Sequence, residues 1–485
     1  MTQKSSRPNF IFIVSDDLGF ADLGCYGGRD AEFGPVSPVL DQLAAAGVKF
    51  TQGYSNSPVC SPTRFGLMTA RYQYRLRGAA EEPINSKSKG STTLGLPPEH
   101  PTLPSLLQDA GYRTALMGKW HLGYPPVFGP LKSGYEEFFG PMSGGVDYFT
   151  HCSNNGTHDL YLGDAEHQAE GYLTDLITDR SVDYIQRMAP GARGGTPFFL
   201  SVHYTAPHWP WETRDDEALA QEVKDNLFHL HGGNIHTYRR MIHHMDEGIG
   251  QLVDTLRAEG LLDNTLIVFT SDNGGERFSD NWPLVGGKMD LTEGGIRVPW
   301  IAHWPARIAA GGVSAQACMT MDWSATMLDA AGVAAHPDYP LDGISLLPVL
   351  HDAAHAFERP LFWRMNHRGQ RAHRDGDWKY LRVDGHDYLF NLPQDERERA
   401  NLAAREPARL AALRAGDWKY LRVDGHDYLF NIPQDERERA NRAKAEPARL
   451  DAMRADWERW NDTMPPIPQD ATISLGYSYQ DMPQR

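Results

Sequence analysis

The sequence predicts an α/β protein whose first domain is an α/β/α sandwich around a large, mostly parallel sheet. Short apolar runs alternate with amphipathic helical patterns, and this alternation is typical of parallel sheets with helices on both faces. The chain has 485 residues, which is more than the roughly 250–300 residues at which a single hydrophobic core stops growing. We therefore expect a large domain over residues 1–357 and a smaller α+β domain with an antiparallel sheet over residues 358–485.

The elements of the large domain are predicted from the period of the apolar residues. The clearest strands are expected at Asn9–Ser15, Tyr112–Met117, Pro197–His203 and Thr265–Ser271. The clearest helices are expected at Val39–Ala46, Leu103–Ala110, Thr174–Met188 and His236–Glu259. The alternation continues to about Leu350, and a β-rich region followed by a helical region comes after it.

The C-terminal domain contains a tandem duplication. Residues 376–415 recur almost unchanged as residues 416–455. The two copies differ only at Leu392/Ile432, Leu402/Arg442, Ala404/Lys444, Arg405/Ala445, Ala411/Asp451 and Leu413/Met453. Each copy predicts a strand, a turn, a second strand and a charged helix. Two repeats are fewer than the roughly three that a solenoid needs, so a recent duplication is the simpler interpretation.

One copy is expected to complete the C-terminal domain, and the other has three possible places. It packs beside the first, protrudes, or contacts another subunit; an insertion without a role is an equally good interpretation. The last residues, 461–485, are rich in Pro, Gln and Tyr and lack a helical period, which predicts an extended tail. From the surplus copy and the tail we expect a homo-oligomer.

The composition excludes several classes of partner. The formal net charge is −16, and an acidic surface repels nucleic acids and anionic membranes. No apolar run is long enough to span a bilayer, and the first one, Phe10–Val14, is too short for a signal-peptide core. We therefore expect a cytoplasmic protein with no nucleic-acid or membrane partner. Its four scattered cysteines are then expected as free thiols: Cys25, Cys60, Cys152 and Cys318.

Two predicted strands end in oxygen-bearing side chains. Asp16 and Asp17 follow the first strand, and Asp272 and Asn273 follow the strand Thr265–Ser271. Ligands of open α/β sheets bind at the carboxyl ends of strands, and Ca²⁺ and Mg²⁺ prefer oxygen ligands. Each pair alone is explained as well by a solvated loop or an Asp-Asn-Gly turn. Together they favour a site for a divalent cation.

A short motif places a cysteine at the start of a helix. Pro62 in the segment Cys60-Ser61-Pro62-Thr63-Arg64 suits the first turn of a helix. Cys60 then lies at the positive end of the helix dipole, and Arg64 projects near it one turn later. For a lone cysteine the alternative is a small buried apolar side chain.

This motif, together with Gly66, Leu67, Thr69 and Arg71 after it, resembles the signature of the sulfatase family, in particular of its arylsulfatase branch. The resemblance extends from Asn9 to about Leu350 and, more loosely, through the Gly-Asp-Trp-Lys-Tyr strand of the C-terminal domain. It implies the alkaline-phosphatase-like fold, hydrolysis of sulfate monoesters, and oxidation of Cys60 to formylglycine by a formylglycine-generating enzyme. It also implies one divalent cation, Ca²⁺ first, with Mg²⁺ or Mn²⁺ as alternatives.

The resemblance also assigns residues through further matching segments, such as Gly118-Lys119-Trp120-His121 and Gly286-Gly287-Lys288. It implies as metal ligands Asp16, Asp17, residue 60, Asp272 and Asn273. It implies as catalytic residues Cys60, Arg64, Lys119, His121, His208, Asp272 and Lys288. Substrate contacts are implied for Lys119, His208 and Lys288, and the match is looser for Ser143 and His151.

Positively charged side chains suit this reaction, because negative charge moves onto the leaving oxygen of a sulfate ester and must be stabilised. Any one of these lysines or histidines is more simply a surface charge or a core histidine, and only their shared position after strand ends favours a site. A phosphonate monoester or phosphodiester hydrolase on the same scaffold is an alternative. A binding protein with unmodified Cys60 is another.

Overall fold

The computed structural model describes residues 7–76, 84, 88–153, 156–223, 232–365, 367–406, 409–410, 418–423, 426–431, 447 and 451. The helices are α1 Asp30–Phe33, α2 Pro38–Ala46, α3 Cys60–Thr69, α4 Leu103–Asp109, α5 Leu173–Arg193, α6 Glu217–Val223, α7 Ile235–Ala258, α8 Glu293–Ile296, α9 Met321–Ala331 and α10 Leu347–His351. The strands before the C-terminal region are β1 Asn9–Ser15, β2 Val48–Phe50, β3 Gly53–Tyr54, β4 Arg113–Gly118, β5 Glu137–Gly140, β6 Tyr161–Leu162, β7 Ala165–Glu166, β8 Phe198–His203, β9 Thr265–Ser271, β10 Trp300–His303, β11 Gly312–Ser314 and β12 Cys318–Met319.

A ten-stranded sheet organises this part of the chain, in the order β11-β2-β10-β9-β1-β8-β4-β5-β6-β7. Its five central strands, from β9 to β5, run parallel, and β10 is antiparallel to both of its neighbours. The predicted α/β class with a mostly parallel sheet is therefore confirmed. The four predicted strands match β1, β4, β8 and β9 within one residue, because each is a short apolar run buried on both faces.

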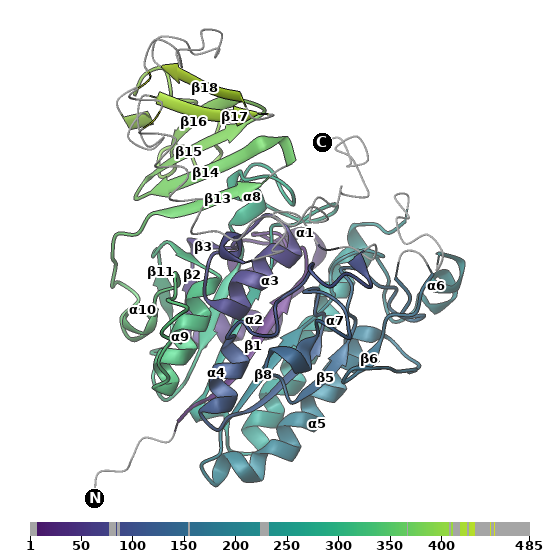
Figure 1. The fold of residues 1–485 in the computed structure, drawn as a ribbon. Coiled ribbons are helices and arrows are strands. Elements are labelled where there is room, and N and C mark those ends of the chain that lie inside the picture. Colours follow the sequence, from purple (N-terminus) through teal and green to yellow (C-terminus); the bar gives the residue numbers. More distant parts are fainter. Residues whose placement is uncertain are drawn as a thin grey trace, which may run out of the picture.

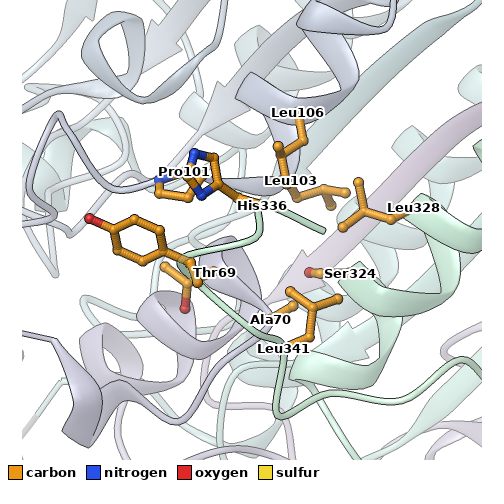
Figure 2. A pocket seen from close by; sticks show the side chains of 10 residues that line it. Thr69, Ala70, Pro101, Leu103, Leu106, Ser324, Leu328, His336 and Leu341 are labelled. Carbon is orange, nitrogen blue, oxygen red and sulfur yellow. The ribbon is translucent and has the colours of Figure 1, made fainter. Parts of the chain in front are cut away.

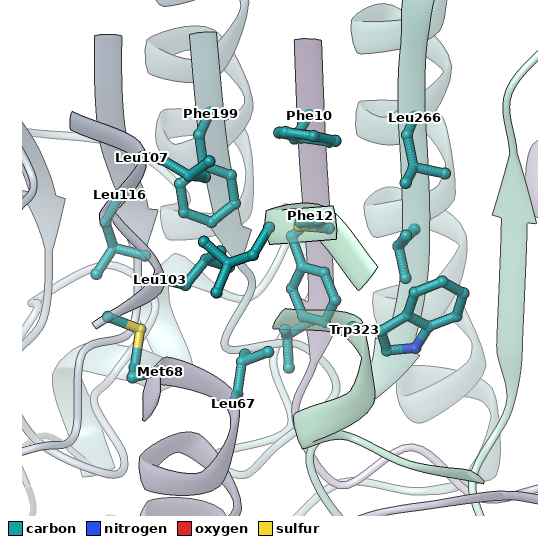
Figure 3. Close-up of a cluster of buried hydrophobic side chains, with 14 of the residues drawn as sticks. Phe10, Phe12, Leu67, Met68, Leu103, Leu107, Leu116, Phe199, Leu266 and Trp323 are labelled. Atoms are coloured by element: carbon teal, nitrogen blue, oxygen red, sulfur yellow. The ribbon is translucent and has the colours of Figure 1, made fainter. Parts of the chain in front are cut away.

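Two hydrophobic cores lie on opposite faces of the sheet. Side chains alternate along a strand, so Phe10 and Phe12 of β1 point into one core and Ile11 and Ile13 into the other. Helices α3, α4 and α9 cover the first face (Figure 3), and α2, α5 and α7 cover the second (Figure 1). Each large apolar side chain buried in this way contributes about 1.5–3 kcal/mol. The predicted sandwich of a sheet between helical layers is thus confirmed.

The C-terminal region contains an antiparallel sheet of four strands in the order β13-β14-β15-β16. They are β13 Leu361–Met365, β14 Gln370–Asp375, β15 Trp378–Val383 and β16 His386–Asn391. The predicted boundary at residues 357 and 358 falls between α10 and β13 and stays a prediction. No helix within the described ranges is long and apolar enough to cross a membrane.

The two copies of the duplication form the same hairpin. In the first copy β15 pairs with β16, and Trp378 lies opposite Asn391. In the second copy β17 Trp418–Val423 pairs with β18 His426–Asn431 in the equivalent register. The second hairpin is a separate two-stranded sheet at the far end of the C-terminal region (Figure 1).

The charged helix predicted after each hairpin is only partly described. In the first copy residues 393–406 form turns and irregular structure, and helix is assigned at Arg409 and Leu410. The Pro-Gln-Asp sequence at residues 393–395 favours turns, since proline and aspartate are typical turn residues. The rest of the helix in both copies, and the tail 461–485, lie outside the described residues.

A buried ion triad joins the first copy to the large domain. The ammonium group of Lys379 on β15 lies 2.9 Å from a carboxylate oxygen of Glu293 on α8 and 2.9 Å from one of Glu398. All three side chains are buried, and the backbone N–H of Glu293 donates to Glu398 at 2.6 Å. Two carboxylates and one ammonium in a dry interface are stable only while every member is present.

Lys379→Met should therefore lower the free energy of unfolding by about 3–5 kcal/mol, because it leaves buried Glu398 without its cation and Glu293 with only the more distant Arg297 guanidinium, at 3.7 Å. Lys419→Met is the matched control, since Lys419 is the identical residue of the second copy. It leaves the triad intact and should cost much less. Denaturant unfolding monitored by tryptophan fluorescence measures both. Equal losses in the two variants would contradict the role given to the first copy.

Candidate functional site

The site forms where parallel strands end side by side. Ser15, the last residue of β1, pairs with Ser271, the last residue of β9. The register therefore brings the next residues, Asp16 and Asp272, to the same point. The backbone N–H of Asp17 donates to a carboxylate oxygen of Asp272 at 3.4 Å, which ties the two strand ends together.

Three carboxylates and one thiol meet at this point. One ligand atom each from Asp16, Asp17, Cys60 and Asp272 lies within 4.8 Å of all the others, and all four side chains are buried. The thiol of Cys60 donates to Asp16 at 3.5 Å, and Cys60 is the first residue of α3. Carboxylates so close together repel one another unless cations surround them.

Asn273 shows that the cluster suits a hard cation. Its side-chain N–H donates to Asp17 at 2.7 Å. Its side-chain oxygen is buried and has no hydrogen-bond partner among the described residues. A buried polar atom without a partner is costly, and such an oxygen can serve as a ligand of a divalent cation. The donor set of carboxylate and amide oxygens thus fits Ca²⁺ or Mg²⁺.

Arg64 and Lys119 supply two of the surrounding cations. The guanidinium of Arg64 binds one oxygen of Asp272 through two nitrogens, at 2.8 and 3.0 Å. The ammonium group of Lys119, which follows β4, forms a short ion pair with Asp16. The Arg64 side chain also donates to the Lys119 carbonyl at 3.1 Å, so the two cations are fixed relative to each other.

Lys288 and His208 lie on the opposite side, at Asp17. The Lys288 ammonium is 2.7 Å from an Asp17 oxygen, and His208 Nε2 is 3.6 Å from the same oxygen. His208 Nδ1 donates to the Trp209 carbonyl at 2.6 Å, which leaves Nε2 facing the cluster. Burial and the charge of Lys288 lower the pKa of His208 to about 3, so its ring is neutral near pH 7.

His121 adopts an unusual backbone conformation, with φ at 58°. Its Nε2 donates to the carbonyl of Ile84, so Nδ1 carries the lone pair of the neutral ring. Nδ1 is buried and has no partner in the described part of the chain. Burial and the charge of Lys119 hold the pKa of His121 well below its usual value. A neutral histidine with a free lone pair can accept a proton.

The two looser assignments have different surroundings. Ser143 precedes Gly144 and Gly145, and added Cβ atoms there would lie 2.4 Å from the His121 ring and 3.0 Å from the His208 ring. The Ser143 hydroxyl itself donates to the Gly145 carbonyl at 3.3 Å. His151 instead contacts the Gly171 carbonyl through Nε2, at 3.2 Å, and in the described part of the chain it forms no hydrogen bond or ion pair with the cluster. Both substrate roles stay predictions.

Two further residues belong to the site although sequence reasoning omitted them. Glu276 lies 3.5 Å from the Lys288 ammonium, and burial raises its pKa to about 7. His203, the last residue of β8, contacts Arg64 at 3.2 Å and the Lys119 carbonyl at 3.1 Å. The sequence could have indicated both residues, since each lies at or just after a predicted strand end where other site residues were expected.

A small pocket lies at the other end of α3 (Figure 2). It is lined mainly by apolar side chains such as Leu103, Leu328 and Leu341, beside Thr69. Helix α3 runs from Cys60 to Thr69, and a rise of about 1.5 Å per residue separates its ends by roughly 14 Å. This pocket is therefore distinct from the carboxylate cluster.

The chain is similar to known proteins in both sequence and structure. The family model named Sulfatase matches residues 8–333, and the model named N-sulphoglucosamine sulphohydrolase, C-terminal, matches residues 287–406. N-acetylgalactosamine-6-sulfatase of Canis lupus familiaris is 32% identical over 392 residues, which cover 73% of this chain and 68% of that protein. Arylsulfatase J of Mus musculus is 32% identical over 355 residues, covering 71% and 56%. The crystal structure of Ps i-CgsB in complex with k-i-k-neocarrahexaose has a TM-score of 0.73 and 31% identity, covering 84% of this chain and 91% of that one.

A buried carboxylate cluster that fits a divalent cation, surrounded by Arg64, Lys119 and Lys288 at the ends of parallel strands, suits an enzyme that hydrolyses anionic esters. The comparisons give its family: the chain belongs to the sulfatases. It is therefore a sulfuric ester hydrolase, and the sequence-based family assignment is confirmed.

A buried pair of carboxyl groups beside the site should make stability depend on pH. Glu212 Oε1 and Asp147 Oδ2 are both buried without a hydrogen-bond donor in the described segments. Burial and the charge of Asp147 raise the pKa of Glu212 to about 9, and a proton on Glu212 would satisfy both oxygens. The other Glu212 oxygen accepts from the Tyr148 N–H at 3.2 Å.

Because the folded state holds this proton and the unfolded state releases it above its ordinary pKa of about 4.3, raising the pH from 5 to 9 should remove stability. Glu212→Gln keeps a donor without a titration. The variant should lose less stability than the wild type over that range, as measured by thermal unfolding at each pH. If the melting temperatures of the two proteins fall equally between pH 5 and pH 9, Glu212 and Asp147 do not share a proton.

Proposed function

We propose that this sulfatase hydrolyses sulfate monoesters of carbohydrates, with formylglycine made from Cys60 as the nucleophile and Ca²⁺ as the cofactor. The names of its relatives support the carbohydrate: one is an N-acetylgalactosamine-6-sulfatase, and one similar structure holds a neocarrahexaose. The observation that carries the proposal is the position of Cys60. It begins α3 and lies within 4.8 Å of three buried carboxylates.

The cation would be held by Asp16, Asp17, Asp272 and Asn273, with residue 60 beside it. When bound, it would lower the pKa of an oxygen on residue 60 and neutralise the ester. Asp16, Asp17 and Asp272 balance Arg64, Lys119 and Lys288, and Glu276, with a pKa of about 7, adds at most one negative charge, so a divalent ion gives the site a net positive charge. This explains how a chain with a net charge of −16 can attract an anionic substrate.

The remaining side chains divide by position. Arg64 and Lys119 are on the Cys60 side, where they orient the nucleophile and the sulfuryl oxygens. His208 and Lys288 are at Asp17, where the Lys288 ammonium would donate the proton that the leaving alcohol takes up and His208 Nε2 would lie beside it. His121, neutral with an available Nδ1, would take the proton that must leave residue 60 when sulfate is released.

Cys60→Ala should reduce turnover of 4-nitrophenyl sulfate to the background rate while leaving the melting temperature within a few degrees of the wild type. The reason is that alanine removes the nucleophile but fits the space of the buried thiol. Cys318→Ala, which removes a buried thiol from the core, is the control and should stay active. Peptide mass spectrometry across position 60 should show the lower mass of the aldehyde. Full activity of a chain with an unmodified thiol at position 60 would contradict the assignment of formylglycine as the nucleophile.

Removal of the cation should abolish activity and lower the melting temperature, and Ca²⁺ should restore both. Binding to the folded state alone stabilises a protein by about 2.7 kcal/mol at a hundredfold excess over the dissociation constant. Asp17→Asn should weaken the Ca²⁺-dependent rise in melting temperature, because it removes a charged ligand. A chelated protein with unchanged melting temperature and activity would rule out the cation.

A further inference from the structure

One loop beside the site carries an exposed tryptophan. Trp282 is 61% exposed, and it lies between β9 and α8 in the loop that also contributes Glu276 and Lys288 to the site. Val285 of the same loop is 39% exposed. Single exposed apolar side chains are common on protein surfaces, so the exposure of Trp282 marks a binding site only together with a second observation.

The loop is held in place, so Trp282 has a defined position relative to the site. The side chain of Asn281, the preceding residue, accepts from the Gly275 N–H at 3.1 Å and donates to the Gly286 carbonyl at 3.2 Å. The Lys288 N–H donates to the Gly275 carbonyl at 3.1 Å. Gly275 thus anchors both Lys288 and the residue next to Trp282.

An arginine of the C-terminal region lies on the tryptophan. The guanidinium carbon of Arg397 is 3.6 Å from the centre of the Trp282 ring. Its neighbours fix it, because Glu396 pairs with Arg297 at 2.7 Å and Glu398 pairs with Lys379 at 2.9 Å. Arg397 itself has no carboxylate partner in the residues that the structure describes, so its positive charge is uncompensated.

These two side chains offer complementary chemistry. An indole face packs against the C–H groups of a sugar ring, while a guanidinium binds a sulfate or carboxylate through paired N–H groups. Stacking on the ring holds the guanidinium in place, which reduces the entropy lost when it binds an anion. An uncompensated cation on an acidic protein selects for anionic ligands.

We propose that Trp282 and Arg397 form a subsite for a second anionic sugar of a sulfated oligosaccharide, next to the sugar whose ester is cleaved. The proposal rests on the proposed function, because it assumes a carbohydrate in the neighbouring site. It also gives the C-terminal region a direct part in substrate selection.

The test compares a small with a large substrate. We expect Trp282→Ala and Arg397→Gln each to lower kcat/KM for a sulfated tetrasaccharide about tenfold relative to kcat/KM for 4-nitrophenyl sulfate, mainly through KM. Tetrasaccharides from carrageenan and from chondroitin sulfate are the two probes. Arg437→Gln, the same change at the equivalent position of the second copy, is the matched control and should leave the ratio unchanged.

Binding of both tetrasaccharides to the Cys60→Ala chain, measured by calorimetry, separates this subsite from the proposed function. A wild type that cleaves 4-nitrophenyl sulfate, with a Cys60→Ala chain that binds neither tetrasaccharide, overturns the subsite alone. Tetrasaccharide binding that depends on Trp282, in a wild type that cleaves no sulfate ester, overturns the proposed function alone. Equal losses on small and large substrates, or a changed oligomeric state in Trp282→Ala, would give the tryptophan a structural role and overturn the subsite.

Discussion

The structure depends on the meeting of like charges at the ends of β1 and β9. Parallel neighbours in register must deliver Asp16 and Asp272 to one place, and burial makes their repulsion expensive. Arg64, Lys119 and Lys288 converge on these carboxylates from α3, from the end of β4 and from the loop after β9. Ion pairs with the buried carboxylates therefore help to hold these three segments in place, together with the hydrophobic packing beneath them.

The need to neutralise buried carboxylates also links the large domain to the C-terminal region. Glu293 begins α8, five residues after Lys288, and its carboxylate is neutralised by Lys379 of β15. The Tyr54 hydroxyl donates to the other Glu293 oxygen at 2.7 Å. The loop that carries a cation of the site is therefore bounded on its far side by a second buried ion cluster. The four-stranded sheet thus supports the loop as well as adding surface around it.

Sequence reasoning predicted the parts of the site that depend on local pattern. Strand ends followed by Asp16 or Asp272 were recognisable because buried strands are short apolar runs, and because parallel strands end at the same edge. It could not predict that Arg397 lies on Trp282, since that contact joins segments more than a hundred residues apart and neither side chain has a periodic signal. The charged helix was predicted without a start, and the structure has turns over residues 393–406 before helix at residues 409 and 410, because proline and aspartate at 393 and 395 favour turns.

The duplicated hairpin has a genetic consequence. Lys379 and Glu396 form ion pairs with the large domain, and Glu398 accepts a hydrogen bond from it; each has an identical counterpart 40 positions later, as Lys419, Glu436 and Glu438. Loss of either unit by recombination would leave a protein that still encodes one complete anchor.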